Sequence, residues 1–195
     1  MTSTAHTGPE TPAPAEETAA GTERTSVTGA AAPASAVEQR LAELGLALPE
    51  VAAPVAAYVP AVISGNHVYT SGQLPFINGK LEATGKVSTG AEGHADEATV
   101  SPETAKHYAA VCAVNALAAV KSVIGDLDRI TRIVKVVGFV SSDPSFTGQP
   151  GVINGASELL GTVLGDAGQH ARSAVGVSVL PLDSPVEVEL IAEFS

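Results

Sequence analysis

The chain has 195 residues, of which 45% are hydrophobic and 16% charged, a composition typical of a globular protein with a sizeable core. Its formal net charge of -11 argues against nucleic acid as a partner, because a phosphate backbone is bound through clustered Lys and Arg side chains. Since the chain has no Trp, four Phe and three Tyr, we expect a core built mainly from Val, Ala, Leu and Ile.

The same sequence predicts a cytoplasmic protein that does not bind a membrane. Its N-terminal residues show neither the basic nor the apolar region of an export signal, and no run approaches the roughly 18 consecutive apolar residues of a membrane span. The single cysteine, Cys112, lies in an Ala- and Val-rich stretch and is expected to be a small buried side chain. The histidines show no spacing typical of metal ligands, so we expect neither a metal nor a cofactor.

The first 34 residues differ from the rest of the chain. They consist mainly of Thr, Ala, Ser, Gly, Pro and Glu without apolar periodicity, which predicts a disordered tail over residues 1–34 and a folded domain over residues 35–195. The domain is expected to begin with a short amphipathic helix, capped at Ser35 and ending before Pro49.

Strands and a long helix are expected next. Residues 58–63 and 67–71 flank a Ser-Gly-Asn turn and predict a hairpin, and residues 74–81 predict a shorter one around an Asn-Gly pair. The polar, Gly-rich stretch 85–100 predicts a loop. The apolar run 103–124 predicts a long helix, because a Ser-Pro pair precedes it and a glycine follows it.

The remaining elements complete the expected fold. Residues 130–140 are β-branched and predict a buried strand, and residues 151–164 predict a second long helix. Two strands, 170–179 and 186–192, are expected to close the chain as a hairpin around a turn at 181–185. This order predicts an α+β fold in which a mixed or antiparallel sheet carries both long helices on one face.

The last two strands alternate between apolar and polar residues. Read with period 2, they place Arg172, Glu187 and Glu189 on one sheet face. If the apolar sides are buried under the helices, that charged face must be either solvated or covered by another subunit, and only the second arrangement makes a pocket.

Several of these motifs resemble the Rid family, also called the YjgF or L-PSP endoribonuclease family, over about residues 55–194. The separation of 15 residues between Arg172 and Glu187 is similar to the family's spacing between its substrate-binding arginine and a C-terminal glutamate. The resemblance rests on Tyr58-Val59, Val68-Tyr69-Thr70-Ser71-Gly72-Gln73-Leu74-Pro75, the stretch 115–123, Lys135-Val136, Phe139-Val140, Asn154, Ala171-Arg172-Ser173 and Val186-Glu187-Val188-Glu189.

The resemblance implies a chorismate-mutase-like homotrimer that hydrolyses reactive 2-imino acids, or their enamine tautomers, to 2-oxo acids and ammonia. In this hypothesis Arg172 grips the substrate carboxylate through its planar guanidinium, and Glu187 orients and partly deprotonates the attacking water. The resemblance also implies four further substrate-binding residues, namely Tyr58, Ser71, Gly72 through its backbone, and Asn154.

The predicted hairpin also bears on where the site lies. If Glu187 pairs near Val179, Arg172 is seven residues further along, about 23 Å away at about 3.3 Å per residue. One subunit then cannot bring the two side chains together. We therefore expect Arg172 of one chain to meet Glu187 of a neighbour, at an interface of the trimer that the resemblance implies.

Other interpretations remain open at this point. Arg172 could form a structural ion pair with Glu189, Asn154 could be an exposed helix residue, and Tyr58 could merely pack at a strand end. Two other functions compete with imine hydrolysis: endoribonuclease or translation-inhibitor activity, which the acidic surface disfavours, and a regulatory trimer that binds a small carboxylate without catalysis.

Overall fold

The computed structural model describes residues 35–51, 57–90 and 99–195. The tail predicted over residues 1–34 lies outside the described residues, as does part of the predicted loop.

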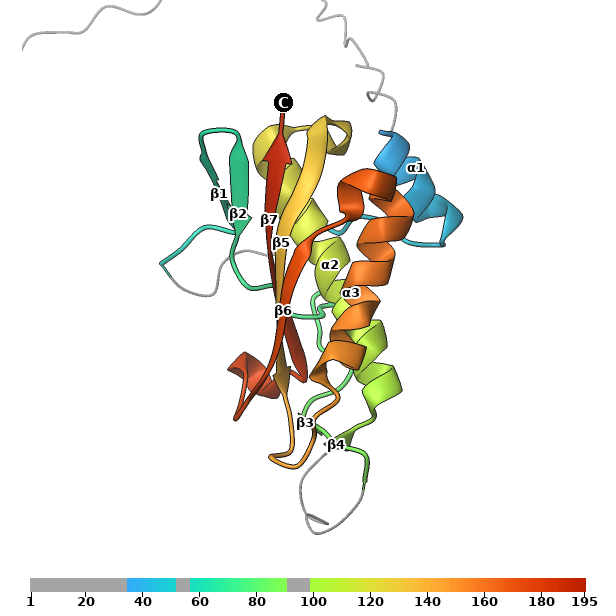
Figure 1. The fold of residues 1–195 in the computed structure, drawn as a ribbon, viewed down its shortest axis with the longest axis vertical. Coiled ribbons are helices and arrows are strands. Elements are labelled where there is room, and N and C mark those ends of the chain that lie inside the picture. Colours follow the sequence, from blue (N-terminus) through green and yellow to red (C-terminus); the bar gives the residue numbers. More distant parts are fainter. Residues whose placement is uncertain (1–34, 52–56, 91–98) are drawn as a thin grey trace, which may run out of the picture. The chain divides into compact units, whose positions relative to one another are not determined.

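The described chain forms an α+β domain with both long helices on one side of a mixed sheet, as predicted (Figure 1). Its helices are α1 (Ala36–Glu43), α2 (Pro102–Ile124) and α3 (Gln149–Leu164). Its strands are β1 (Ala61–Ser64), β2 (His67–Thr70), β3 (Lys86–Val87), β4 (Thr99–Val100), β5 (Ile130–Ser141), β6 (Ala171–Val177) and β7 (Val186–Phe194).

The long helix α2 begins and ends as its sequence predicts. The Ser101 hydroxyl accepts a hydrogen bond from the Thr104 N–H at 3.1 Å, and Gly125 ends the helix at a φ of +85°, in the left-handed region that favours glycine. Cys112 is fully buried on this helix, as expected. By length and composition α2 could cross a membrane, but 61% of its most apolar window is buried inside the domain, which is usual for a core helix.

The short helix α1 is tied to the domain at its first turn. Ser35 and Glu38 form a reciprocal capping box, which confirms the predicted cap. The Asp128 carboxylate accepts hydrogen bonds from the next two free N–H groups, those of Ala36 at 2.8 Å and Val37 at 3.0 Å. A side chain distant in sequence therefore completes the cap and fixes α1 against the domain.

Both predicted turns at the N-terminal edge of the sheet are present. β1 and β2 pair antiparallel around a tight turn at Gly65, and the bridge between Ile77 and Lys80 encloses Asn78 and Gly79, both of which have positive φ. Within the stretch predicted as a loop, β3 and β4 form a two-residue parallel pair.

The sheet order is β1-β2-β7-β5-β6, which differs from the predicted pairing of the last two strands. β6 pairs parallel with β5, and β7 pairs antiparallel with the other edge of β5. The predicted hairpin is therefore wrong, because β5 lies between its two strands. The physical reason is that β5, α3 and β6 form a crossover unit, which brings β6 back to one edge of β5 and leaves the other edge to β7.

The predicted charged face is also wrong. Arg172 pairs with the buried Val136 and therefore points to the helix side of the sheet, whereas Glu187 pairs with Phe139 and points to the open side. On β7 the predicted alternation holds, since Val186, Val188 and Leu190 are buried in the core. On the edge strand β6 the pattern showed two faces correctly, but period 2 alone does not say which face meets the helices.

The contact between α2 and α3 depends on a glycine. A Cβ at Gly155 would lie 1.9 Å from the backbone carbonyl oxygen of Lys106 on α2, so the helices approach too closely for any other residue.

We predict that Gly155→Ala lowers the free energy of unfolding by about 1–3 kcal/mol, the usual cost of overpacking. A Cβ at Gly161 on the same helix would contact nothing within 4 Å, so Gly161→Ala should stabilise the domain by up to about 1 kcal/mol. Urea unfolding of the two variants measures both changes, and equal effects would contradict this packing.

Candidate functional site

Arg172 lies near the start of the edge strand β6 and is held by α3. Its Nη1 donates hydrogen bonds to Asn154 Oδ1 at 2.8 Å and to Ser157 Oγ at 3.1 Å. The structure thus brings together two of the predicted site residues, Arg172 and Asn154. Because both hydrogen bonds come from Nη1, the described residues leave Nη2 and Nε free to bind a carboxylate.

The position of α3 follows from its packing on β5. Gly138 of β5 has no side chain, and a Cβ there would lie 2.4 Å from Ile153 Cδ1, so Ile153 fills the space above this glycine. This contact sets the rotation of α3. Asn154 and Ser157 are three residues apart and share one helix face, which is therefore turned toward β6 and Arg172.

Glu187 lies at the start of β7, beside another predicted residue, Gly72. A Cβ at Gly72 would lie 1.6 Å from Glu187 Oε1, so the carboxylate rests directly against the glycine backbone. Reciprocal hydrogen bonds between Gln73 and Val188, at 2.9 and 3.0 Å, hold this segment against β7. A side chain at position 72 would therefore displace the Glu187 carboxylate from this position.

Ser71 and Tyr58 complete this region in different ways. The Ser71 hydroxyl donates to the Val59 carbonyl at 2.7 Å, and the Ser71 N–H donates to the Pro60 carbonyl at 2.8 Å. These bonds tie the end of β2 to the segment that carries Tyr58, whose side chain is 46% exposed. Ser71 therefore lies next to Gly72 in the chain, and Tyr58 is exposed on the segment that Ser71 holds.

Burial changes the acidity of Glu187. It raises the pKa of this carboxyl above its usual value, and the negative charge of Glu189 raises the pKa further. Burial also raises the pKa of Glu189. A carboxylate with a raised pKa is a stronger base, so Glu187 suits the activation of water better than an exposed glutamate would.

The predicted residues thus form two separate groups within one chain. Glu187 is in register with Phe139 and Val175, so Arg172 lies two strands away and three residues along, about 10 Å in each direction, and on the opposite face. The predicted separation of about 23 Å along a hairpin is therefore wrong, but one chain still cannot place both side chains on the same small ligand. An ion pair between Arg172 and Glu189 is excluded for the same reason, because they too lie on opposite faces.

Two residues around Arg172 were not predicted as site residues. Ser157 contacts Arg172 directly, and His170 contacts Ser157 at 2.9 Å. The spacing of Ser157 from Asn154, one helix turn, was a signal that could have identified the serine. No local sequence pattern indicated His170 as a neighbour of Arg172 and Ser157.

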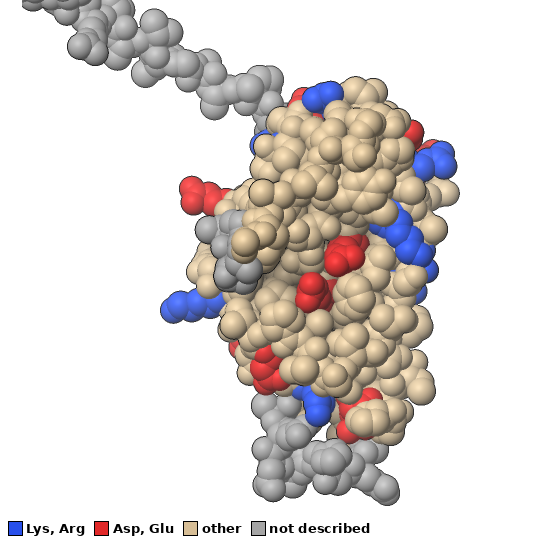
Figure 2. All heavy atoms as spheres, turned by 90° about the vertical axis from the view of Figure 1, so that its left-hand side faces the viewer, with Lys and Arg blue, Asp and Glu red and all other residues tan. Residues whose placement is uncertain are grey.

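The open face of the sheet is acidic at its centre and apolar around it. Figure 2 shows acidic side chains gathered near the middle of this face, with Lys and Arg nearer the outline of the molecule. Glu187 and Glu189 project to this side, together with Val62, Tyr69 and Val175, which are 41–49% exposed. Large exposed apolar side chains grouped on one face are typical of a surface that another protein chain covers.

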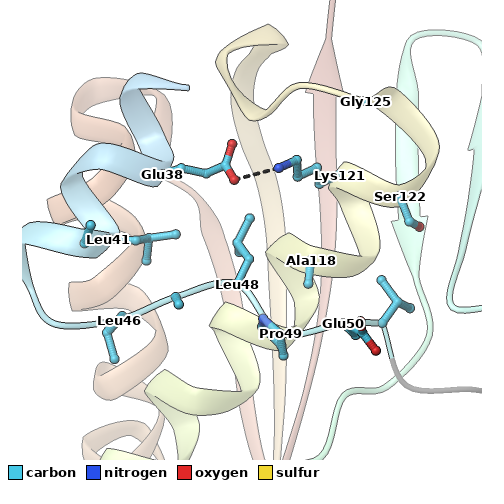
Figure 3. A pocket seen from close by; sticks show the side chains of 13 residues that line it. Glu38, Leu41, Leu46, Leu48, Pro49, Glu50, Ala118, Lys121, Ser122 and Gly125 are labelled. Carbon is cyan, nitrogen blue, oxygen red and sulfur yellow. Dashed lines mark hydrogen bonds and ion pairs between the residues drawn. The ribbon is translucent and has the colours of Figure 1, made fainter. Parts of the chain in front are cut away.

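A cavity elsewhere in the domain contains none of the predicted site residues. It has a volume of about 580 Å³ and lies between α1, the segment after it and α2 (Figure 3). Glu38 and Lys121 form an ion pair at 2.6 Å beside its leucine side chains, and this hydrogen bond lowers the pKa of the Glu38 carboxyl. Because the two charges satisfy each other, they offer little to a ligand.

Among residues 35–51, 57–90 and 99–195, no three His, Cys, Asp or Glu side chains are arranged to hold a metal ion.

Comparison with known proteins identifies the family of this domain. A sequence model of the family described as "YjgF/chorismate mutase-like, putative endoribonuclease" matches residues 38–194. Protein TCP17 of Trypanosoma cruzi is 41% identical over 160 residues, which cover 82% of this chain and 94% of that protein.

Several solved structures are similar to this chain, and two of them illustrate the extent of the similarity. Protein Atu1372 of Agrobacterium tumefaciens, described as having unknown function, has 48% identity and a TM-score of 0.72, over 82% of this chain and 93% of that one. A "putative endoribonuclease" of Shewanella oneidensis has 35% identity and a TM-score of 0.73, over 81% of this chain and 99% of that one.

The family match runs from within α1 to the last residue of β7 and includes every predicted site residue. With its mixed sheet, its two helices on one face and this extent of similarity, the chain belongs to the YjgF/chorismate mutase-like family.

Proposed function

We propose that the protein hydrolyses 2-imino acids, or their enamine tautomers, to 2-oxo acids and ammonia. The observation that carries this proposal is the arrangement of Arg172, whose Nη1 is held by Asn154 and Ser157 while its other donors stay free. A guanidinium fixed in this way is suited to hold a small carboxylate in a defined orientation.

The reaction needs few further groups, because an imine carbon is already electrophilic. Glu187 accepts a proton from water as the water oxygen bonds to the imine carbon, and it passes that proton to the nitrogen as the C=N π bond opens, which gives a carbinolamine. Glu187 then moves the hydroxyl proton to the nitrogen as the C–N bond breaks, so that ammonia leaves and the hydroxyl oxygen becomes the oxo oxygen of the product. Overall, one water is consumed and one ammonia is formed for each imino acid. The raised pKa of Glu187 supports its role as the base.

The proposed active site requires a second copy of the chain. Since Arg172 and Glu187 lie on opposite faces, the proposal pairs Arg172 of one copy with Glu187 of the next, in a homotrimer whose open sheet faces meet inside. Gly72, Ser71 and Tyr58 would then complete the Glu187 side of each site, and Asn154 the Arg172 side. The exposed apolar residues of the open face support this assembly.

Endoribonuclease activity, which the names of relatives suggest, fits this chain less well. RNA binding needs positive charge to compensate the phosphates, whereas the chain carries a net charge of -11 and places Glu187 and Glu189 at the centre of its open face. A trimer that binds a carboxylate without turnover remains the alternative that the experiments below separate from catalysis.

Arg172 variants test the proposed carboxylate contact. We predict that Arg172→Ala lowers kcat/KM for 2-iminobutyrate at least about tenfold, because a hydrogen bond to a charged group contributes about 1.5–3 kcal/mol. Arg172→Lys should also be impaired, because an ammonium has three N–H donors, and replacing the bonds to Asn154 and Ser157 leaves only one for the carboxylate. The imine is generated with an amino-acid oxidase, and its decay is followed for each variant.

Lys106→Ala serves as the matched control. It removes one positive charge from an exposed ion pair with Glu158 on the outer helix layer and should leave kcat/KM unchanged. Equal rates of imine decay with the wild-type protein and with Arg172→Ala would contradict the hydrolase proposal. Wild-type binding of 2-oxobutyrate without any imine decay would instead indicate a non-catalytic carboxylate-binding protein.

The Glu187–Glu189 pair makes a prediction about pH. Water activation needs ionised Glu187, so kcat/KM should fall as the pH drops through the pKa of this group. Glu189→Gln removes the neighbouring negative charge, which makes ionisation of Glu187 less costly and lowers its pKa. The acidic limb of the pH profile should therefore move to lower pH.

Glu193→Gln is the control for that measurement, because it removes a like charge six residues away on the same strand. Its pH profile should match that of wild type. An acidic limb that stays in place in Glu189→Gln, or that moves to higher pH, would show that Glu187 is not the titrating base.

A further inference from the structure

A chain of hydrogen bonds continues behind Arg172 into residues that the proposed mechanism does not use. Arg172 Nη1 lies 3.1 Å from Ser157 Oγ, and Ser157 Oγ lies 2.9 Å from His170 Nε2. The other ring nitrogen, His170 Nδ1, lies 2.6 Å from the carbonyl oxygen of Gly168. Three side chains and one backbone carbonyl are therefore connected in series.

The direction of each hydrogen bond follows from the chemistry of the two ends. A guanidinium can only donate, so Ser157 Oγ accepts from Arg172. A carbonyl oxygen can only accept, so His170 Nδ1 carries a proton and donates to Gly168. In a neutral ring Nε2 then has a lone pair and accepts the hydroxyl proton of Ser157. With a neutral ring, every group in the series therefore has a defined role as donor or acceptor.

We propose that Ser157 and His170 are positioning residues, which hold the Arg172 guanidinium in the orientation that binds the substrate carboxylate. This inference rests on the proposed function, since it assigns a role to residues behind the same arginine. His170 fixes the hydroxyl of Ser157, and the fixed hydroxyl turns one lone pair toward Arg172 Nη1. Together with Asn154 Oδ1, it occupies both N–H bonds of that nitrogen.

The far end of the series is rigidly placed. A Cβ at Gly168 would lie 2.3 Å from the backbone carbonyl oxygen of Leu160, so the turn that carries Gly168 packs directly on α3. Ser157 lies on the same helix, and His170 immediately precedes β6, which carries Arg172. The hydrogen bonds thus join two elements whose relative position is already fixed by packing, which is the arrangement expected of a preorganised site.

A cavity of about 380 Å³ gives this arrangement its access to a ligand. Its lining includes Ser157, His170 and Arg172, and the remaining lining residues are Gly161, Gly168 and Gln169. A carboxylate held by the free donors of Arg172 would therefore lie next to the positioning residues. A small change in the position of Ser157 or His170 can therefore change the affinity for the ligand.

A serine hydroxyl that donates to a histidine also resembles a nucleophile with its base. Here, however, Ser157 Oγ already accepts from the positively charged Arg172, which engages one of its two lone pairs and makes the oxygen a weaker nucleophile. The geometry therefore favours a positioning role for Ser157.

The two amide substitutions of His170 separate this role from simple packing. The amide of Gln reaches as far as Nε2 and can still accept from Ser157, whereas the shorter amide of Asn reaches only as far as Nδ1. We expect His170→Gln to bind 2-oxobutyrate nearly as tightly as wild type. His170→Asn and Ser157→Ala should bind it about 3- to 10-fold more weakly, the effect of one lost hydrogen bond. Titration calorimetry at about pH 8, where an ordinary imidazole is neutral, measures each Kd.

Kinetics and a matched hydroxyl variant complete the test. In His170→Asn the loss should appear mainly in KM with kcat nearly unchanged, because Arg172 holds the carboxylate throughout the reaction. Thr162→Ala removes another α3 hydroxyl, one that donates to the Glu158 carbonyl, and should leave both KM and Kd unchanged.

The outcomes distinguish this inference from the proposed function. Equal Kd values for His170→Asn and His170→Gln, or wild-type affinity in Ser157→Ala, would overturn the positioning role even if imine hydrolysis is confirmed. Absence of turnover in wild type would overturn the proposed hydrolysis, while the Kd comparison would still test the positioning role. Nitrogen-15 NMR of labelled histidine should show His170 protonated at Nδ1, and a proton on Nε2 alone would contradict the series.

Discussion

Two charged side chains of one sheet, Arg172 and Glu187, lie two strands apart and on opposite faces, because they are in register with Val136 and Phe139 of the intervening strand β5, whose side chains alternate between the faces. This constraint follows from the β5–α3–β6 crossover, which is the only connection in the sheet that makes two strands parallel among the described residues. The crossover also places α3 over β6, so that Asn154 and Ser157 can hold the guanidinium. The same crossover therefore positions the arginine side of the proposed site. It also keeps Glu187 of the same chain away from that side.

The open face supports the proposal that a second copy is the partner. Glu187 rests against the backbone of Gly72, and its burial there raises the pKa of its carboxyl. The exposed side chains of Val62, Tyr69 and Val175 project from the same face. A neighbouring chain that covers this face would remove apolar surface from water, and its Arg172 would bring a positive charge toward the carboxylate. Assembly and catalysis are thus proposed to depend on the same surface.

Local features could be predicted from the sequence because local chemistry determines them. The caps at Ser35 and Ser101 and the end of α2 at Gly125 lie where the sequence indicated. The strand order could not be predicted in this way, because period 2 reports two faces of a strand but neither its neighbours nor its buried side. The contact of Ser157 with His170 was missed for a similar reason, since packing of α3 against the start of β6 brings the two side chains together.

The most direct test of the shared site mixes two inactive variants. Arg172→Ala retains Glu187, and Glu187→Gln retains Arg172, so a site between two different copies can contain both intact residues. If the copies exchange at random, about one quarter of the sites in an equimolar mixture would be intact. The account predicts that denaturing and refolding the two variants together restores about that fraction of wild-type imine hydrolysis, whereas each variant refolded alone stays inactive. A refolded mixture that forms mixed oligomers but no more activity than its components would contradict a site built from two chains.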